Sequence, residues 1–319
     1  MGNFSIEKEL IRNERLVTRS IQIGFFASAF FLANAVFFDV AVPFFVPFWA
    51  VIQSQFPKMR KATLAGGIIG AFSLNFGQLF ILIMQLLLFQ ILNKWKQQPL
   101  PLAFQVSIAT LTVQVLWQII YAQGLPTFDV WMAVLFEVLL AYVMTLLVGI
   151  SVQGQPLQFS LPWKADRIIA SLIIVSIMVT GMTSFQFGQF SLSIFLIHLL
   201  LCVIGFRFSF ATTVMTATVI GTIIAVANLS FTGMLSVVIL TGIVIGLSRP
   251  LGKVGIAFIS VLPSVFFFLY DATLPLDSVY FVSIAIAMGA FLMIPVQAYQ
   301  KVEYYFQPVS YTHLRAHET

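Results

Sequence analysis

Long apolar runs, separated by short polar turns, follow one another along most of the chain. The hydrocarbon core of a bilayer is about 30 Å thick, and an α-helix needs about 20 apolar residues to cross it. In lipid each backbone N–H and C=O group needs a partner within its own segment, so these runs are expected to be helices. The pattern predicts twelve apolar segments, at 21–38, 41–56, 62–74, 76–93, 102–122, 130–151, 167–184, 191–206, 209–228, 231–247, 253–270 and 279–296.

Two of these segments are weak candidates for a full crossing. Pro43 and Pro47 stand in the segment 41–56, and proline kinks or shortens a helix. The segment 62–74 is short for a crossing. The sequence therefore predicts an all-α fold, a polytopic transmembrane helical bundle of ten to twelve spans.

The composition excludes a soluble globular chain. Hydrophobic residues make up 60% of the sequence and charged residues 8%, and the mean hydropathy is +1.01. This composition makes the lipid bilayer the expected partner. The formal net charge of +5 comes from lysines and arginines in loops and does not indicate nucleic-acid binding. Cys202 is the single cysteine, which excludes a disulfide within the chain.

The charged residues of the loops separate by sign. Lysine and arginine concentrate in the short cytoplasmic loops of membrane proteins. If the N-terminus is cytoplasmic, the loops on that side carry Lys58, Arg60, Lys61, Lys94, Lys96, Lys164, Arg167, Arg207, Arg249, Lys253 and Lys301. The opposite loops carry Asp39, Asp129, Asp271 and Asp277, and neither lysine nor arginine. We therefore expect both termini in the cytoplasm.

The same pattern divides the chain into four regions. Residues 1–20, rich in charge of both signs, are expected to form a cytoplasmic amphipathic helix that continues into the first span. The membrane domain covers 21–296, and 297–307 begins a cytoplasmic linker. Residues 308–319, "PVSYTHLRAHET", are similar to an in-frame translation of a transposon-type sequencing adapter. We interpret them as not native, leave His313, Arg315 and His317 out of functional reasoning, and expect the natural chain to continue beyond Gln307.

Glu137 is the one carboxylate inside a predicted span. An ionisable group in a membrane is costly and is by default a functional hypothesis. Gln114 and Gln118, four residues apart on the preceding span, could face it. Two interpretations follow. Glu137 is either a proton or ligand site, or, as we favour, a protonated side chain that is hydrogen-bonded to a neighbouring helix.

His198 is a lone histidine within a predicted span, without another histidine, cysteine or carboxylate nearby in the sequence. Helix–helix hydrogen bonding is therefore favoured over metal binding. The signatures H-E-x-x-H, G-x-x-x-x-G-K-[ST], C-x-x-C and G-x-S-x-G do not occur. We predict no catalytic, cofactor-binding or metal-binding residues.

Two glycine pairs have a spacing that is typical of close helix packing. Gly66 and Gly70 form one pair, and Gly242 and Gly246 the other. Glycines four residues apart share one helix face, where the missing side chains let a neighbouring backbone approach. We predict helix-packing roles for all four.

The order and spacing of several segments resemble the N-terminal membrane region of the stage II sporulation protein E family. These segments are "VPFFVPFWAV", "FDVWMAVLFEVLLAYVMTLL", "ADRIIASLIIVSIMVTGM", "TATVIGTIIAVANLSFTGMLSVVILTGIVIGLSRPLGKVGIAF" and "MIPVQAYQKVEYYF". The resemblance covers most of residues 20–306.

The resemblance implies a multi-pass protein at the polar septum of endospore-forming bacteria. In that family the membrane region precedes a segment that interacts with cell-division proteins, and a metal-dependent serine/threonine phosphatase follows. The phosphatase dephosphorylates an anti-anti-sigma factor and so activates the forespore sigma factor. The Mn²⁺ or Mg²⁺ site belongs to that missing domain, so this chain is expected to be a non-catalytic anchor that self-associates.

A secondary transporter or lipid-handling permease is the alternative. Twelve apolar segments suit that class. Coupled transport, however, usually needs several ionisable groups in the membrane and broken helices around a central site. Here Glu137, His198 and the segment around Pro43 and Pro47 are the only candidates for such features.

Overall fold

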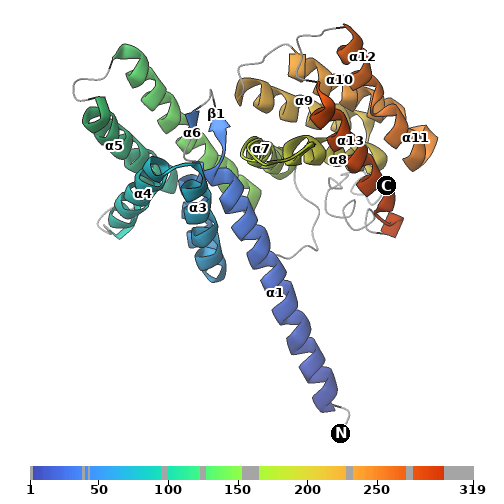
Figure 1. Ribbon diagram of the computed structural model, residues 1–319. Helices are drawn as coiled ribbons and strands as arrows, with labels where there is room; N and C mark the ends of the chain where they lie inside the picture. The colour runs from blue at the N-terminus through green and yellow to red at the C-terminus, as the bar shows by residue number, and fades with distance from the viewer. Residues whose placement is uncertain are drawn as a thin grey trace, which may run out of the picture. The chain divides into compact units, whose positions relative to one another are not determined.

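The described part of the chain is built mainly from α-helices (Figure 1). The computed structural model describes residues 3–37, 40–41, 44–94, 100–122, 127–152, 165–227, 233–270 and 276–297. The helices are α1 (Asn3–Ala33), α2 (Phe45–Gln55), α3 (Arg60–Leu74), α4 (Phe76–Lys94), α5 (Leu102–Ala122), α6 (Phe128–Val152), α7 (Ala165–Thr180), α8 (Leu192–Arg207), α9 (Phe210–Ala227), α10 (Gly233–Leu247), α11 (Gly252–Ile259), α12 (Leu262–Tyr270) and α13 (Ser278–Met293). The prediction of an all-α bundle is confirmed.

Short elements complete the described part of the chain. The 3₁₀ turns are η1 (Pro57–Met59) and η2 (Arg249–Leu251). Two two-stranded hairpins pair β1 (Val36–Phe37) with β2 (Val40–Ala41) and β3 (Gln186–Phe187) with β4 (Phe190–Ser191). Pro43, Asp39, the loop 153–164, the linker after Gln297 and the segment 308–319 lie outside the described residues.

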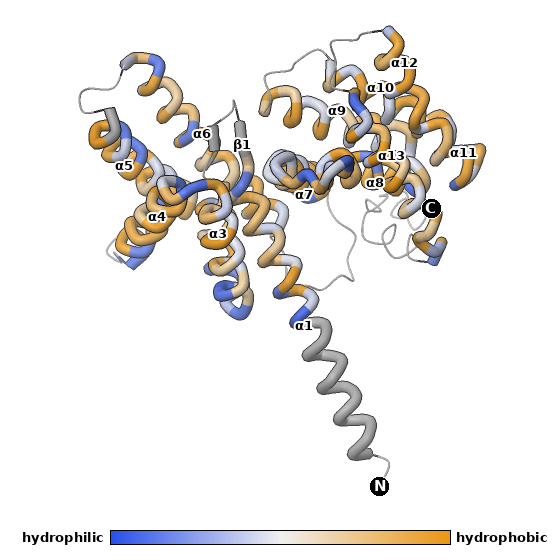
Figure 2. Tube along the Cα trace, viewed as in Figure 1, coloured by the Kyte–Doolittle hydropathy of each residue, from blue (hydrophilic) through white to orange (hydrophobic). Residues whose placement is uncertain are grey.

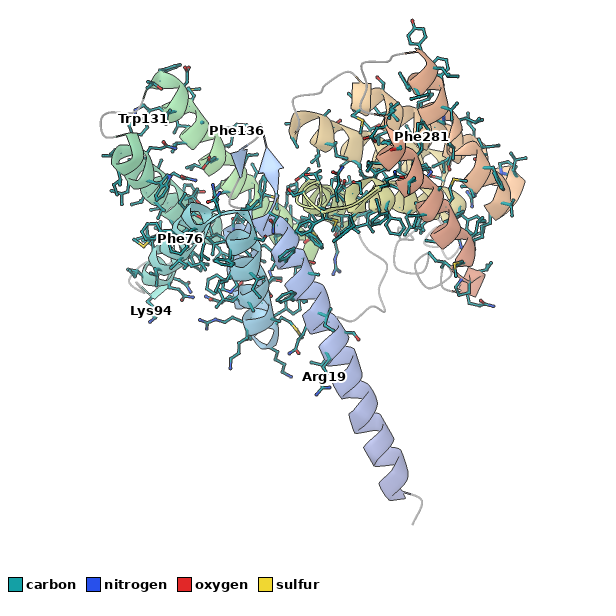
Figure 3. All side chains as sticks on the ribbon, viewed as in Figure 1. Arg19, Phe76, Lys94, Trp131, Phe136 and Phe281 are labelled. Carbon is teal, nitrogen blue, oxygen red and sulfur yellow. The ribbon has the colours of Figure 1, made fainter. Side chains whose placement is uncertain are left out.

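Hydrophobic residues run along most of the described helices (Figure 2). Many large apolar side chains are exposed, as a lipid-facing protein requires. Phe76 and Phe136, labelled in Figure 3, are 75% and 37% exposed. Among the described residues, four helices, α4, α5, α6 and α9, are long and apolar enough to cross a bilayer, and α10 with the bent segment after it would make a fifth. Helices α8 and α13 are shorter apolar helices. The exact number of ten to twelve spans and the cytoplasmic position of both termini stay predictions.

The helices form two compact units, which we describe separately. The first contains α1 to α6. Within it α3 packs along α1, and α4 packs against both α3 and α5. Helix α2 is buried from Phe45 to Ile52. At about 1.5 Å per residue, its 11 residues reach about 17 Å, which is roughly half of a bilayer core. The segment 41–56 therefore supplies a core helix of this unit.

The second unit contains α7 to α13. Helices α9 and α10 pack along one another, as do α8 and α13. The last two run in parallel, because Ser191 N donates to Ser283 Oγ at one end and Arg207 Nη2 donates to the carbonyl of Val296 at the other. This direction agrees with the alternation of crossings that the charge pattern predicts for the segments from α8 to α13.

The prediction of one continuous helix in the second unit is wrong. The sequence predicts a single crossing over 253–270, but the chain forms α11 and α12, separated at Ser260 and Val261. Pro263 explains the break, since its ring clashes with the carbonyl four residues earlier and it lacks a backbone N–H. The segment of η2 and α11 is bent by 56° from α10. Gly252 permits this turn with a φ of 69°.

Candidate functional site

Glu137 and Gln114 form a hydrogen-bonded pair between α6 and α5. The Nε2 of Gln114 donates to the Oε2 of Glu137 at 2.5 Å. Glu137 is 9% and Gln114 5% exposed. Gln118 lies one turn further along α5, is only half-buried, and makes no hydrogen bond to Glu137. Of the two glutamines that the sequence suggested, the structure therefore brings Gln114 alone to the carboxyl group.

The buried polar face of α5 is longer than the sequence analysis indicated. Ser107 and Thr110 are 8% and 0% exposed, and their hydroxyl groups have no hydrogen-bond partner among the protein atoms of the described residues. Other buried hydroxyls donate to a carbonyl of their own helix, as that of Thr145 does to Ala141 at 2.7 Å. Ser107 and Thr110 stand seven and four residues before Gln114, on the same helix face. This spacing was the signal in the sequence that could have revealed them.

Breaking the pair between Gln114 and Glu137 should cost stability. Gln114→Leu leaves the carboxyl group buried without its donor, and we expect a loss of about 1–3 kcal/mol in unfolding free energy. The double variant Gln114→Leu/Glu137→Leu should recover part of this loss, because it removes both polar groups. Thermal unfolding in detergent measures both effects. Gln118→Leu is the matched control, and an equal loss in this control would contradict the assignment.

His198 lies in a polar cluster of the second unit, at the break between α11 and α12. Its Nε2 is 2.9 Å from the Oγ of Ser260, which in turn donates to the carbonyl of Ala257 at 2.7 Å. Ser264 Oγ donates to the hydroxyl of Tyr280 at 3.4 Å. His198, Ser260 and Ser264 are all buried. The histidine therefore links α8 to the broken helix by a side-chain hydrogen bond.

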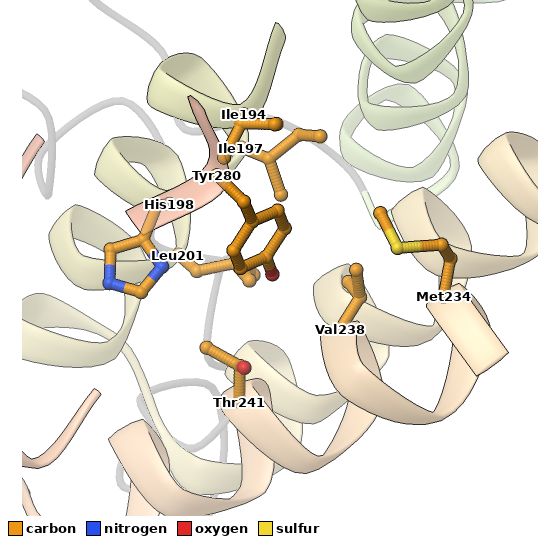
Figure 4. Close-up of a pocket in the computed structure, with 8 residues that line it drawn as sticks. All are labelled: Ile194, Ile197, His198, Leu201, Met234, Val238, Thr241 and Tyr280. Atoms are coloured by element: carbon orange, nitrogen blue, oxygen red, sulfur yellow. The ribbon is translucent and has the colours of Figure 1, made fainter. Parts of the chain in front are cut away.

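A small cavity lies beside this cluster (Figure 4). Residues of α8 line it, His198 among them, together with Met234, Val238 and Thr241 of α10 and Tyr280 of α13. Its volume of about 20 Å³ suits one water molecule, whereas pockets for small-molecule ligands usually hold 300 Å³ or more. In the described part of the chain no group of three His, Cys, Asp or Glu side chains could hold a metal ion.

The predicted glycine pairs lie at close helix contacts. A Cβ atom at Gly66 would overlap the carbonyl oxygen of Phe26 on α1, and one at Gly70 would lie 2.5 Å from that of Phe30. A Cβ at Gly242 would overlap the Cβ of Ala217 on α9. A Cβ at Gly246 would lie 2.8 Å from the ring of Phe210. All four positions therefore face a neighbouring helix.

The family model described as "SpoIIE, N-terminal domain" matches residues 3–303. No curated protein and no solved structure matches the chain.

Proposed function

The chain belongs to the SpoIIE N-terminal domain family, and on this premise we propose that it anchors a sporulation protein phosphatase in the membrane and localises it at the polar septum. The observation that carries the proposal is the family match over residues 3–303. The apolar helices, four of them long enough to span a bilayer, support the anchoring role. The whole protein would activate the forespore sigma factor by dephosphorylating the anti-anti-sigma factor.

This region would hold the phosphatase at the membrane and bring copies of the protein together, while catalysis would lie elsewhere in the protein. The Mn²⁺ or Mg²⁺ ions of the phosphatase would need a cluster of carboxylates, and the described residues do not offer such a cluster. The proposed partners are the lipid bilayer, further copies of this chain and the cell-division proteins at the septum.

A transport function finds less support in the buried polar groups. The broken helix and His198 are features that transporters also use. The cavity beside them, however, has room for about one water molecule. Glu137 is hydrogen-bonded to Gln114 and lies in the other unit. Anchoring therefore remains the better-supported function.

The location of a fluorescent fusion tests the proposal. We expect residues 1–307, joined to a fluorescent protein in a sporulating endospore-former, to concentrate at the polar septum. Protease added outside the cells should leave the fused protein intact, because the C-terminal exit is expected in the cytoplasm. The variant Glu137→Gln is expected to keep this location if Glu137 only packs. An even distribution over the cell membrane would contradict septal localisation, and digestion from outside would contradict the topology.

A further inference from the structure

Three basic side chains from separate segments gather where α8 and α13 end. Arg207 Nη2 donates to the carbonyl of Val296, and Arg249 Nη2 donates to that of Arg207, both at 3.4 Å. Lys253 Nζ donates to the carbonyls of Leu292 at 2.7 Å and Ile294 at 2.6 Å. Basic groups are favoured at helix C-termini, where the helix dipole is negative. We call Arg207, Arg249 and Lys253 the basic end of the second unit.

The basic end adjoins an exposed apolar stripe. Leu251, Val254 and Phe258 are 60%, 59% and 65% exposed and follow a spacing of three and four residues along η2 and α11. Ile256 and Ala257, on the other side of α11, are fully buried. A short helix with one apolar face toward the surroundings and a basic group beside it is typical of the boundary between headgroups and acyl chains. The 56° bend from α10 sets α11 at an angle to the helix before it.

We propose that this end of the second unit binds an anionic phospholipid. Arg249 is the principal contact of the lipid phosphate, since its guanidinium is exposed and carries five N–H donors in a planar fork. Arg207 and Lys253 add positive charge, and the acyl chains lie against Leu251, Val254 and Phe258. The apolar stripe selects a lipid over a free phosphate ion.

The site also adjoins the exit from the last apolar helix. Lys253 and Arg207 donate to carbonyls between Leu292 and Val296. The two basic side chains near the bound lipid would therefore also hold the segment that leaves α13. The proposal rests on insertion of this domain in a membrane. It does not depend on septal localisation, so the fluorescent fusion and the lipid measurement can fail independently.

Lipid retention by the purified full chain tests the site. The chain is equilibrated in detergent with equal amounts of dioleoylphosphatidylglycerol and dioleoylphosphatidylcholine, and the retained lipids are counted by native mass spectrometry. We expect the wild-type chain to retain phosphatidylglycerol preferentially. Arg249→Gln should lower this retention about fivefold, the effect of one basic group near an anionic lipid. Arg249→Lys should give an intermediate retention, because the charge is kept but the planar fork of donors is lost.

Two controls separate this site from general charge effects. Lys58→Gln/Lys61→Gln removes two exposed basic groups from the first unit and should leave the preference unchanged. Inorganic phosphate at the same concentration should not displace the lipid. Equal retention by Arg249→Gln and the wild type would overturn the proposal. So would an equal loss in the Lys58/Lys61 variant, or displacement by phosphate. Arg249→Gln changes an exposed side chain, so the variant is expected to fold.

Discussion

Gly66→Ala is expected to destabilise the first unit strongly. The new Cβ would overlap the carbonyl oxygen of Phe26, which belongs to the backbone of α1 and cannot rotate away. Helices α1 and α3 would have to separate along a long shared contact. Overpacking of this kind costs about 1–3 kcal/mol, and a rigid backbone neighbour puts the loss at the upper end.

Thermal unfolding of the purified chain, or resistance to protease in detergent, measures this loss. Gly24→Ala is the control, since Gly24 lies on α1, the helix that Gly66 of α3 contacts, but a Cβ there would have no neighbour within 4 Å. It should be neutral or slightly stabilising, because alanine favours a helix over glycine by about 0.5–1 kcal/mol. An unchanged midpoint for Gly66→Ala would show that α1 and α3 do not pack as described.

Gly242→Ala is expected to have the second large effect, and this one can be reversed. A Cβ at Gly242 would overlap the Cβ of Ala217 on α9, so the two helices would be forced apart. Ala217→Gly removes the other methyl group, and the double variant Ala217→Gly/Gly242→Ala should recover most of the lost stability. We expect about 1–3 kcal/mol of loss for Gly242→Ala alone.

A double-mutant cycle measures the coupling between the two positions. Residues in direct contact commonly give interaction energies of 0.5–3 kcal/mol. Gly289→Ala on α13 is the control, because a Cβ there would have no neighbouring atom within 4 Å. Strict additivity of Gly242→Ala and Ala217→Gly would refute the contact between α9 and α10 at this point.

The helical segments were predictable because their signals are local. A helix satisfies its backbone hydrogen bonds within itself, so an apolar run of sufficient length specifies a membrane helix without reference to the rest of the fold. The segment 76–93 corresponds to α4 and 102–122 to α5 for this reason. The break before Pro263 was also a local signal, but the predicted span 253–270 rested on the length of the apolar run alone.

The partners of the buried polar groups were less predictable. Helical spacing placed Gln114 and Gln118 on one face of α5, but it could not say which of them meets Glu137, because the answer depends on how α5 and α6 cross. His198 and Ser260 are 62 residues apart in the sequence. No spacing rule joins them, since only the packing of α8 against the broken helix brings them together.

By itself the sequence determined an α-helical membrane protein, because hydrophobic length acts along the chain. Its resemblance to the SpoIIE N-terminal family lay in the order and spacing of several segments, and the family match confirms it. Tertiary structure alone decided which backbone Gly66 faces, which glutamine binds Glu137, and that Arg207, Arg249 and Lys253 meet at one end of the second unit. These outcomes depend on the crossing and register of neighbouring helices. In lipid, close packing and hydrogen bonds between helices determine both, and each needs atoms from two distant segments.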